Sequence, residues 1–406
     1  MVKQSENRGP LANGGRGQGA PQTRTQEAYS RLAAMAQEIG PDGQLPTFAE
    51  LRDLLGVSVV TLNNALALLE SHRILYRRHG VGIFVSPKLG RKSIALLCSP
   101  RFFEGPEISP FWQILVDQIL EYSGQRGHDF TMHFSARAGM EAPLFEDFVR
   151  SVEEQRVQGV LGVGLRRGAV DWLAEHSIPT VGFASSTDYS VDVSYESLIY
   201  DAVEMLAEKG YRRIGLWVNH YWRELPERFW ERPEEWGEHR TVPVYRVALE
   251  RSGLVFDPAL LHDSRTLQGE TPGGEPPRTF WEQGVQMAHR VFGPGSDPAE
   301  RPEAVISPSE LFTQGILIGL QRVGLQPGTD VQVVTHANRH SPVLRPWERE
   351  ILVYEVDPAE IAQIMLGMLE ALMSGEPVPE PKPLHRPRLR NGQYLSEAPS
   401  VRQFKP

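Results

Sequence analysis

Residues 45–85 read LPTFAELRDLLGVSVVTLNNALALLESHRILYRRHGVGIFV, and this stretch decides the fold of the amino-terminal part of the chain. The segment 47–55 has helical apolar spacing and ends at Gly56, a residue suited to a helix C-terminus. Ser58 can then cap a second helix by accepting a hydrogen bond from a free backbone N–H. The apolar residues of that helix recur at i, i+3, i+4 and i+7, which places them in one buried stripe: Leu62, Ala65, Leu66 and Leu69.

A hairpin is predicted directly after the second helix. Residues 74–78 and 83–85 have the composition of short strands, and His-Gly-Val-Gly at 79–82 joins them. The glycines permit the positive φ that such a tip needs. With a further helix expected over 25–39, the pattern predicts a winged helix-turn-helix domain.

The spacing of these elements resembles the GntR family of bacterial transcription regulators. The residues that match the family pattern are Leu45-Pro46, Glu50-Leu51, Leu55-Gly56-Val57-Ser58, Thr61, Ala65-Leu66, Leu69-Glu70, Tyr76-Arg77-Arg78, Gly80, Gly82, Phe84 and Val85. The resemblance implies that the second helix is a recognition helix that reads half of an operator. A winged-helix domain that binds only protein is the alternative.

By this resemblance, the DNA contacts come from the turn, the second helix and the wing. We expect them from Thr47, Arg52, Ser58, Val59, Val60, Thr61, Asn63, Asn64, Arg77, Arg78, His79 and Gly80. The family usually has basic residues where this chain has Ala49, Val59 and Asn63, so the recognition helix is short of cations. Asn63 and Asn64 can instead bond adenine in the major groove, and a valine can contact a thymine methyl. Arg52, the wing arginines and His79 are therefore expected to supply most backbone contacts.

Arg73 occupies a position before the wing where the family commonly has glycine. A non-glycine residue in a left-handed conformation costs about 1 kcal/mol. The turn at this position is therefore expected to differ from that of the family.

The charge of the chain is unevenly distributed. The net charge is −9, but residues 1–92 hold 12 Lys and Arg against 7 Asp and Glu, a net charge of +5, which leaves −14 for the rest. A basic amino-terminal module on an acidic body is expected when only the module meets phosphate. A few solvated arginines are the alternative explanation.

Length and cysteine content limit the class of protein. A chain of 406 residues is long enough for two or three domains. The single cysteine, Cys98, excludes an internal disulfide and fits a reducing cytoplasm. No segment approaches the length of a membrane span, and no apolar stretch at the N-terminus indicates a secretory signal. We therefore predict a cytoplasmic protein without a membrane partner.

From Ser93 onward, apolar runs of strand length alternate with amphipathic helical segments. The expected strands are 94–98, 130–134, 160–163, 180–183, 214–218, 304–306, 331–334 and 351–354, and the expected helices are 111–125, 144–155, 170–176, 195–209, 244–251, 282–291, 310–323 and 358–373. Repeated strand–helix–strand units imply parallel sheets with helices on both faces. Because the stretch is too long for one compact lobe, the pattern predicts an α/β domain with two doubly wound sheets.

The order of local signatures in this part resembles the effector domain of the LacI family, which shares the two-lobed fold of periplasmic sugar-binding proteins. The matching segments are Ser93-Ile94-Ala95-Leu96, Pro110-Phe111-Trp112, Val157-Gln158-Gly159-Val160, Ile178-Pro179-Thr180-Val181, Gly210-Tyr211-Arg212-Arg213-Ile214, Glu303-Ala304-Val305, Gly315, Gly324, Asp330-Val331-Gln332-Val333-Val334 and Val356-Asp357. Only about 219–243 and 254–279 lack a counterpart, and both are interpreted as insertions or loops. A GntR-type reader joined to a LacI-type effector domain resembles the arabinose repressor group.

The changes in composition predict the domain boundaries. The expected parts are a disordered tail over 1–24, the winged helix-turn-helix domain over 25–85, a linker over 86–92, the effector-binding and dimerisation domain over 93–392, and a C-terminal tail over 393–406.

The second resemblance also implies where a small ligand binds. In this fold a ligand lies between the lobes, at the carboxyl ends of parallel strands. The implied positions are Phe111, Trp112, Ser194, Tyr195, Trp217, Arg240, Glu310 and Asn338. Sugar-binding relatives usually have aspartate at Ser194, Glu310 and Asn338, all of which can still form hydrogen bonds. A neutral hydroxylated ligand such as a sugar is expected, and plain core packing is the alternative for each aromatic.

Signals for catalysis or for a cofactor are poor. Gly162-Val163-Gly164 is followed by Gly168, one residue beyond the spacing of the dinucleotide fingerprint, so a turn at a strand end explains it better. His336 and His340 are four residues apart but follow a strand, and no third metal ligand is evident. We therefore expect no enzyme activity, no catalytic residue, no cofactor and no metal.

Together the two parts predict a ligand-responsive bacterial transcription regulator, a repressor that binds double-stranded operator DNA. Because one recognition helix reads a half-site, a homodimer is expected to read a palindrome. The alternative is a solute-binding protein of the periplasmic-binding-protein fold without regulatory DNA binding, and the added winged domain argues against it. An enzyme on a doubly wound fold is a third hypothesis.

Overall fold

The computed structural model describes residues 24–104, 107–136, 142–220, 238–267 and 279–390. The chain divides into two compact units, Met1–Arg91 and Lys92–Pro406. The expected tails, apart from Arg24 at the start of the first helix, lie outside the described residues, and so does most of the 219–243 segment.

The first unit is the winged helix-turn-helix domain. Its elements are α1 (Arg24–Ile39), α2 (Phe48–Leu55), α3 (Val59–Ser71) and the antiparallel strands β1 (Leu75–Arg78) and β2 (Gly82–Val85). Thr47 begins α2 with a capping box to Glu50, and Gly56 ends it at a φ of 64°. Ser58 then caps α3, because its hydroxyl accepts from the Thr61 N–H at 3.1 Å. The predicted apolar stripe of α3 is buried in a core that all three helices and both strands share.

The turn before the wing corrects one expectation. Arg73 adopts a φ of 56°, so this chain keeps the left-handed conformation that glycine would favour. Its backbone N–H donates to the Glu70 carbonyl, and the next residue, Ile74, donates to Leu69. The turn is therefore built with an arginine at a cost of about 1 kcal/mol.

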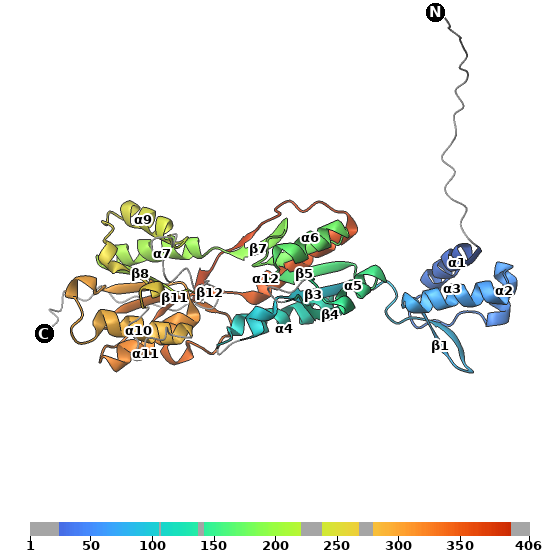
Figure 1. Cartoon of the computed structure of the whole chain (residues 1–406), viewed down its shortest axis with the longest axis horizontal. Coiled ribbons are helices and arrows are strands. Elements are labelled where there is room, and N and C mark those ends of the chain that lie inside the picture. Colours follow the sequence, from blue (N-terminus) through green and yellow to red (C-terminus); the bar gives the residue numbers. More distant parts are fainter. Residues whose placement is uncertain (1–23, 105–106, 137–141, 221–237, 268–278, 391–406) are drawn as a thin grey trace, which may run out of the picture. The chain divides into compact units, whose positions relative to one another are not determined.

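The second unit begins with a lobe built on a parallel sheet. Its strand order is β13-β7-β6-β5-β3-β4, with bounds β3 (Ser93–Cys98), β4 (Asp129–Phe134), β5 (Gly159–Val163), β6 (Thr180–Phe183), β7 (Tyr189–Val193) and β13 (Leu384–His385). Helices α4 (Pro110–Gln125) and α12 (Pro358–Ser374) pack on one face, and α5 (Glu146–Glu153) and α6 (Arg167–Glu175) on the other (Figure 1). Both faces of the central strands β3, β5 and β6 are covered, so these strands lack polar alternation.

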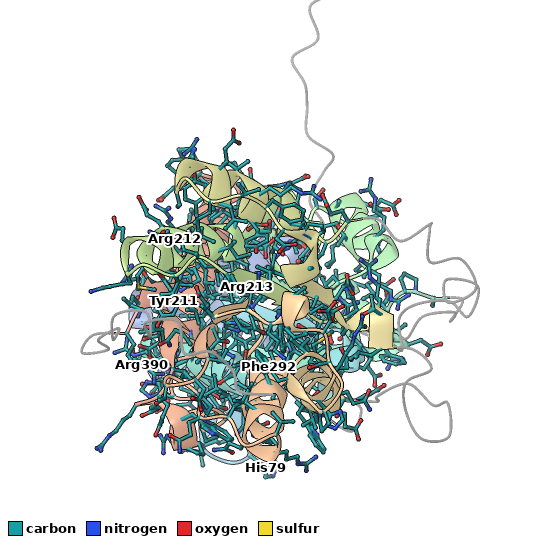
Figure 2. All side chains as sticks on the ribbon, turned by 90° about the vertical axis from the view of Figure 1, so that its left-hand side faces the viewer. His79, Tyr211, Arg212, Arg213, Phe292 and Arg390 are labelled. Atoms are coloured by element: carbon teal, nitrogen blue, oxygen red, sulfur yellow. The ribbon has the colours of Figure 1, made fainter. Side chains whose placement is uncertain are left out.

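The second lobe repeats this plan. Its strand order is β14-β12-β11-β10-β8-β9, with bounds β8 (Ile214–Val218), β9 (Leu261–Asp263), β10 (Ala304–Ser307), β11 (Gln332–Asn338), β12 (Leu352–Val356) and an antiparallel edge, β14 (Arg388–Leu389). Helices α7 (Tyr195–Glu208) and α9 (Val242–Arg251) cover one face, and α10 (Phe280–Phe292) and α11 (Glu310–Arg322) cover the other. The turn that leads into β8 carries Tyr211, Arg212 and Arg213, labelled in Figure 2, and the Glu303 carboxylate accepts from the last two backbone N–H groups at 2.8 and 3.0 Å.

The predicted strands and helices of this unit are all present. The sequence missed four short strands, β7, β9, β13 and β14. Strand β9, with 3-10 turns at Pro258–Leu260 and Ser264–Leu267, falls in the 254–279 stretch interpreted as an insertion or loop. That interpretation is corrected for 254–267, because the strand pairs with β8 and closes one edge of the sheet. Residues 268–278 lie outside the described residues.

The chain passes between the two lobes at three places, and His385 joins them. The connections are β7 to α7, β12 to α12, and β13 to β14. The carbonyl of His385 accepts from the Ser194 N–H at 2.9 Å, and its Nε2 accepts from the Asp357 N–H at 3.1 Å. Residues from all three connections are therefore tied at one buried point, the natural position for a hinge.

Close packing of α10 on α11 gives a stability prediction. A Cβ at Gly315 would lie 1.9 Å from the Trp281 carbonyl oxygen, which is fixed helix backbone. We expect Gly315→Ala to lower the free energy of unfolding of the second unit by about 1–3 kcal/mol, because the helices must separate. In the control, Gly367→Ala in α12, nothing lies within 4 Å of the new methyl, and better helix propensity should raise stability by about 0.5–1 kcal/mol. Thermal unfolding of the full chain measures both, and an unchanged Gly315 variant would contradict the close contact.

Candidate functional site

The exposed face of α3 is the first candidate site. Val59 and Val60 are exposed on its first turn, and Asn63 and Asn64 follow on the same side. His79 and Gly80 are exposed at the tip of the wing. The face therefore presents apolar and amide groups rather than cations, as the sequence predicted.

Four of the residues expected at DNA have clear structural roles. Thr47 and Ser58 use their hydroxyls in the caps of α2 and α3, with Thr61 completing the second. Arg52 pairs with its neighbour Asp53 at 2.9 Å. These positions shape the helix-turn-helix whether or not they also touch DNA.

The two wing arginines are held differently. Arg77 binds Glu70 through Nε at 2.8 Å and donates to Asn63 Oδ1 at 3.4 Å, so it links the wing to α3. The Arg78 guanidinium lies over the Tyr76 and Phe84 rings, 5.6 and 5.4 Å from their centroids. This packing holds Arg78 in place without neutralising its charge. Arg78 is therefore the better candidate for a phosphate contact.

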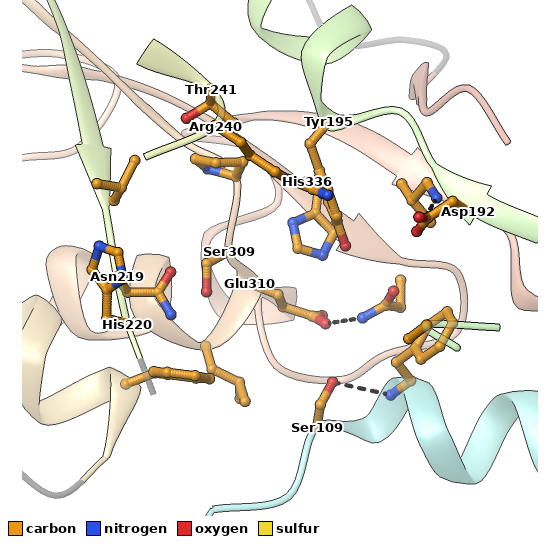
Figure 3. Close-up of a pocket in the computed structure, with 18 of the residues that line it drawn as sticks. Ser109, Asp192, Tyr195, Asn219, His220, Arg240, Thr241, Ser309, Glu310 and His336 are labelled. Atoms are coloured by element: carbon orange, nitrogen blue, oxygen red, sulfur yellow. Dashed lines mark hydrogen bonds between the residues drawn. The ribbon is translucent and has the colours of Figure 1, made fainter. Parts of the chain in front are cut away.

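The second candidate site is a pocket of about 530 Å³ between the lobes of the second unit. It lies at the carboxyl ends of β6, β7, β8, β10 and β11, where a doubly wound sheet binds ligands. Figure 3 shows the polar side chains that project into it. Six of the eight positions implied by the resemblance line it: Phe111, Trp112, Tyr195, Arg240, Glu310 and Asn338.

The other two positions are corrected. Trp217 is fully buried in the core beneath α10 and α11, next to Phe292, and does not line the pocket. Ser194 is also absent from the lining, because its hydroxyl caps α7 by accepting from the Ser197 N–H at 3.3 Å. Trp217 belongs to a strand that is buried on both faces, so the direction of its side chain could not be deduced from periodicity.

Aromatic side chains form one wall of the pocket. Phe111 packs against Trp112 and Phe183, with ring centroids 4.9 and 5.0 Å apart. On the opposite lobe, Arg240 lies over the Tyr195 ring at 5.8 Å and pairs with Glu196 at 3.7 Å. The walls offer flat apolar surface of the kind on which a sugar ring stacks.

Polar groups form the buried end of the pocket. Glu310 is 3% exposed, and its Oε2 accepts from Asn338 Nδ2 at 2.6 Å. Burial raises the pKa of Glu310, while hydrogen bonds from Ser341 and Asn338 oppose that rise. The sequence missed further lining residues that follow strand ends or begin helices: Phe183, Asp192, His220, His239, Phe280, Ser309 and His336. Position directly after β8 could have identified His220, but no motif marks the others.

His336 and His340, which were considered as metal ligands, have different surroundings in the structure. His336 is buried in the pocket, whereas His340 is exposed at a φ of 70°. Across the described residues, no group of three or more His, Cys, Asp and Glu side chains could hold a metal ion. In the same part of the chain, no single helix is long and apolar enough to cross a membrane, although the bent pair α2 and α3 passes the length and composition test together.

A carboxylate links the two lobes next to the pocket. Glu107, before α4, accepts from the backbone N–H groups of Phe280 and Trp281 at 2.6 and 3.3 Å, at the start of α10. Burial raises the pKa of Glu107, and these two hydrogen bonds lower it. Such charge-assisted bonds contribute about 1.5–3 kcal/mol each.

Removing this link should loosen the start of α10. We expect Glu107→Ala to make the Phe280 and Trp281 amides exchange about 10-fold faster or more, because both lose their acceptor. Hydrogen exchange of the full chain, followed by mass spectrometry, measures this. Glu146→Ala, at an exposed carboxylate in α5, is the control. Unchanged protection in the Glu107 variant would show that the link does not hold the lobes together.

Two family models match the sequence, each over one unit. Residues 24–85 match "Bacterial regulatory proteins, gntR family", and residues 203–393 match "Periplasmic binding protein-like domain". No curated protein sequence matches the chain. The first match covers the winged helix-turn-helix, and the second covers most of the second lobe together with α12.

Solved structures share the fold of the chain. A regulatory protein of the LacI family from Chloroflexus aggregans is 17% identical, with a TM-score of 0.55, over 73% of this chain and 96% of its own. The transcriptional regulator CelR in complex with cellobiose is 20% identical, with a TM-score of 0.52, over 90% and 97%. The Lac repressor dimer bound to operator and the anti-inducer ONPF is 17% identical, with a TM-score of 0.52, over 74% and 93%.

Proposed function

We propose that this transcription regulator, a GntR-type winged helix-turn-helix joined to a periplasmic-binding-protein-like domain, is a repressor controlled by a small hydroxylated ligand. One observation carries the proposal: a chain with a DNA-reading domain also contains a ligand-sized pocket between two hinged lobes. Structures of the same fold include one with cellobiose and one with operator DNA. The winged domain argues against the alternative, a solute-binding protein, because binding a solute does not require a DNA-reading domain.

The pocket suits a sugar or polyol. Its aromatic wall can stack on a ring, and Glu310, Asn338 and Ser309 can bond hydroxyls. A ligand changes operator affinity only through its different affinity for the open and closed lobes, typically by 1–3 kcal/mol. We also propose a cytoplasmic location, because a repressor meets its operator DNA there.

The test is operator selection followed by a ligand screen. Random duplexes are selected on the full chain, and operator affinity is then measured by fluorescence anisotropy with and without sugars and polyols. We expect a palindromic site and at least one compound that weakens binding. A thermal-shift screen identifies binders independently, because a ligand of the folded state raises the melting temperature. Failure to select any DNA would contradict the proposal.

We also propose a homodimer that pairs through the β4 edge of the first lobe. Phe130, Met132 and Phe134 alternate on the side of β4 that α4 covers, and Phe130 packs into the core there. Met132 and Phe134 are each 40% exposed, and Leu120 of α4 is 52% exposed. An open strand edge with apolar side chains is a natural surface for association.

The proposed interface predicts that a charge on β4 prevents dimerisation. We expect Phe134→Glu to shift the full chain from dimer to monomer and weaken binding to a palindrome, since a buried unpaired charge opposes the interface. Leu384→Glu, at the opposite edge of the same sheet and 58% exposed, is the matched control. Sedimentation velocity measures both, and a dimeric Phe134 variant would place the interface elsewhere.

A further inference from the structure

Two buried side chains that line the pocket each have a polar atom without a hydrogen-bond partner in the part of the chain that the structure describes. Glu310 and His336 are 3% and 6% exposed, and both line the pocket. Within the described residues, Glu310 Oε1 and His336 Nδ1 have no hydrogen-bond partner. A buried polar atom without a partner is costly, so a group that pairs with both would bind favourably. Figure 3 shows the two side chains projecting into the pocket from β11 and the start of α11.

The hydrogen bonding of His336 makes Nδ1 an acceptor. The Pro308 backbone raises the pKa of His336, against the larger effect of burial. Proline has no N–H, so this backbone group is the carbonyl, which acts as an acceptor for the ring. Since Nδ1 has no partner among the described residues, we assign the ring proton to Nε2. Burial lowers the pKa of His336 to about 4, and a neutral imidazole carries one proton, which leaves a lone pair on Nδ1.

Glu310 also presents an acceptor. Burial raises the pKa of Glu310, and the Ser341 hydroxyl, the Asn338 amide and the charge of Arg390 oppose that rise. These groups favour the carboxylate, which has no proton to donate. Among the described lining residues, Arg240 is the only lysine or arginine. Of the lining histidines, His239 has a pKa lowered to about 4 by burial, and His220 pairs with Asp263 at 3.1 Å. Arg240 already pairs with Glu196.

We propose that Glu310 and His336 form an acceptor-only subsite that binds neighbouring hydroxyl or ammonium groups of the effector and rejects a carboxylate or phosphate at that end. The inference rests on the proposed function and narrows its ligand class. A donor pair satisfies Glu310 Oε1 and His336 Nδ1 together. An anionic group would face two lone pairs in a desolvated site, and this repulsion supplies specificity.

The tautomer can be measured without knowing the effector. Long-range proton–nitrogen correlation of the 15N-labelled full chain at pH 7 distinguishes bare from protonated ring nitrogens. The signal lost in His336→Phe identifies the residue. We expect Nδ1 to be bare and Nε2 to carry the proton. A proton on Nδ1 would overturn the subsite, because the atom would then donate.

The ligand class is tested with matched pairs. Glucose, galactose, arabinose and cellobiose are each compared with the corresponding aldonic acid by thermal shift and by release of a selected operator. Glucosamine and glucose 6-phosphate complete the panel. We expect at least one neutral or amine member to bind, and its acid or phosphate to bind at least about 10-fold more weakly.

Variants assign the effect to His336. His336→Phe keeps a ring against Tyr195 and should weaken the neutral ligand about 10-fold, whereas His336→Gln, which can still accept, should recover part of that loss. His262→Phe is the control, a buried histidine of the same lobe away from the pocket. Equal or tighter binding of an acid, an unchanged His336→Phe, or no binder at all would overturn the subsite. Operator release by an acid would overturn the subsite but leave the regulator proposal intact. The absence of any selected operator would contradict only the regulator proposal.

Discussion

Asn338→Ala should abolish the effect of ligand on operator binding and leave ligand-free operator affinity unchanged. Asn338 ends β11, is buried, and donates to Glu310 Oε2 at 2.6 Å. Removing the amide leaves a buried carboxylate without that donor and removes a group that can bond a hydroxyl. A hydrogen bond to a charged group contributes about 1.5–3 kcal/mol, so ligand affinity should fall about 10- to 100-fold.

The measurement is operator affinity of the full chain with and without the ligand that screening identifies. Gln332→Ala is the matched control, because Gln332 is buried at the other end of the same strand and does not line the pocket. A variant that still responds fully would place the effector elsewhere. A variant that loses operator binding without ligand would show that Asn338 supports the fold instead.

The loss should be confined to the response because the two sites belong to separate units. We expect ligand binding to change the lobe equilibrium around the connections that His385 joins, and the amino-terminal unit has its own core. Removing a ligand contact therefore removes the differential affinity without altering the DNA-reading surface.

Asn64→Ala and Arg78→Ala should both weaken operator binding, the first at one base position and the second for all sequences alike. Asn64 is exposed on α3, where its amide can form two hydrogen bonds with adenine, so the variant should lose about 1–3 kcal/mol at one base position and tolerate other bases there. Arg78, held over Tyr76 and Phe84, should contact phosphate. Arg78→Ala should weaken all sequences alike and reduce the salt slope by about one.

Arg77→Ala is the control within the same hairpin. Because Glu70 already neutralises Arg77, its removal should change the salt slope less than loss of Arg78. Affinities for the selected site and its single-base variants, each at several salt concentrations, measure these differences. Wild-type behaviour in both the Asn64 and Arg78 variants would make the recognition-helix assignment wrong.

Periodicity predicted the elements of the fold because it reports how many faces of a segment are buried. The i, i+3, i+4, i+7 stripe placed α3, and Gly56 and Ser58 marked the turn before it. Long apolar runs placed the central strands. Strands of two or three residues, such as β13 and β9, have too few positions for a pattern, so they were missed.

The amino-acid order was therefore sufficient for the two-part architecture, since helix caps, apolar spacing and strand ends are local properties. The resemblance to a known fold indicated six of the residues that line the pocket. The direction and partners of each side chain required the folded structure. Trp217 and Val218 are neighbours on β8, and successive strand residues point to opposite faces. Trp217 therefore packs beneath α10 and α11, whereas Val218 packs beneath α7 and α9 and, as the last residue of the strand, also lines the pocket. Arg77 pairs with Glu70, seven residues away, and His336 of β11 lies near the backbone of Pro308, which follows β10. Such pairings depend on the folded structure. In it, Glu310 Oε1 and His336 Nδ1 have no hydrogen-bond partner among the described residues.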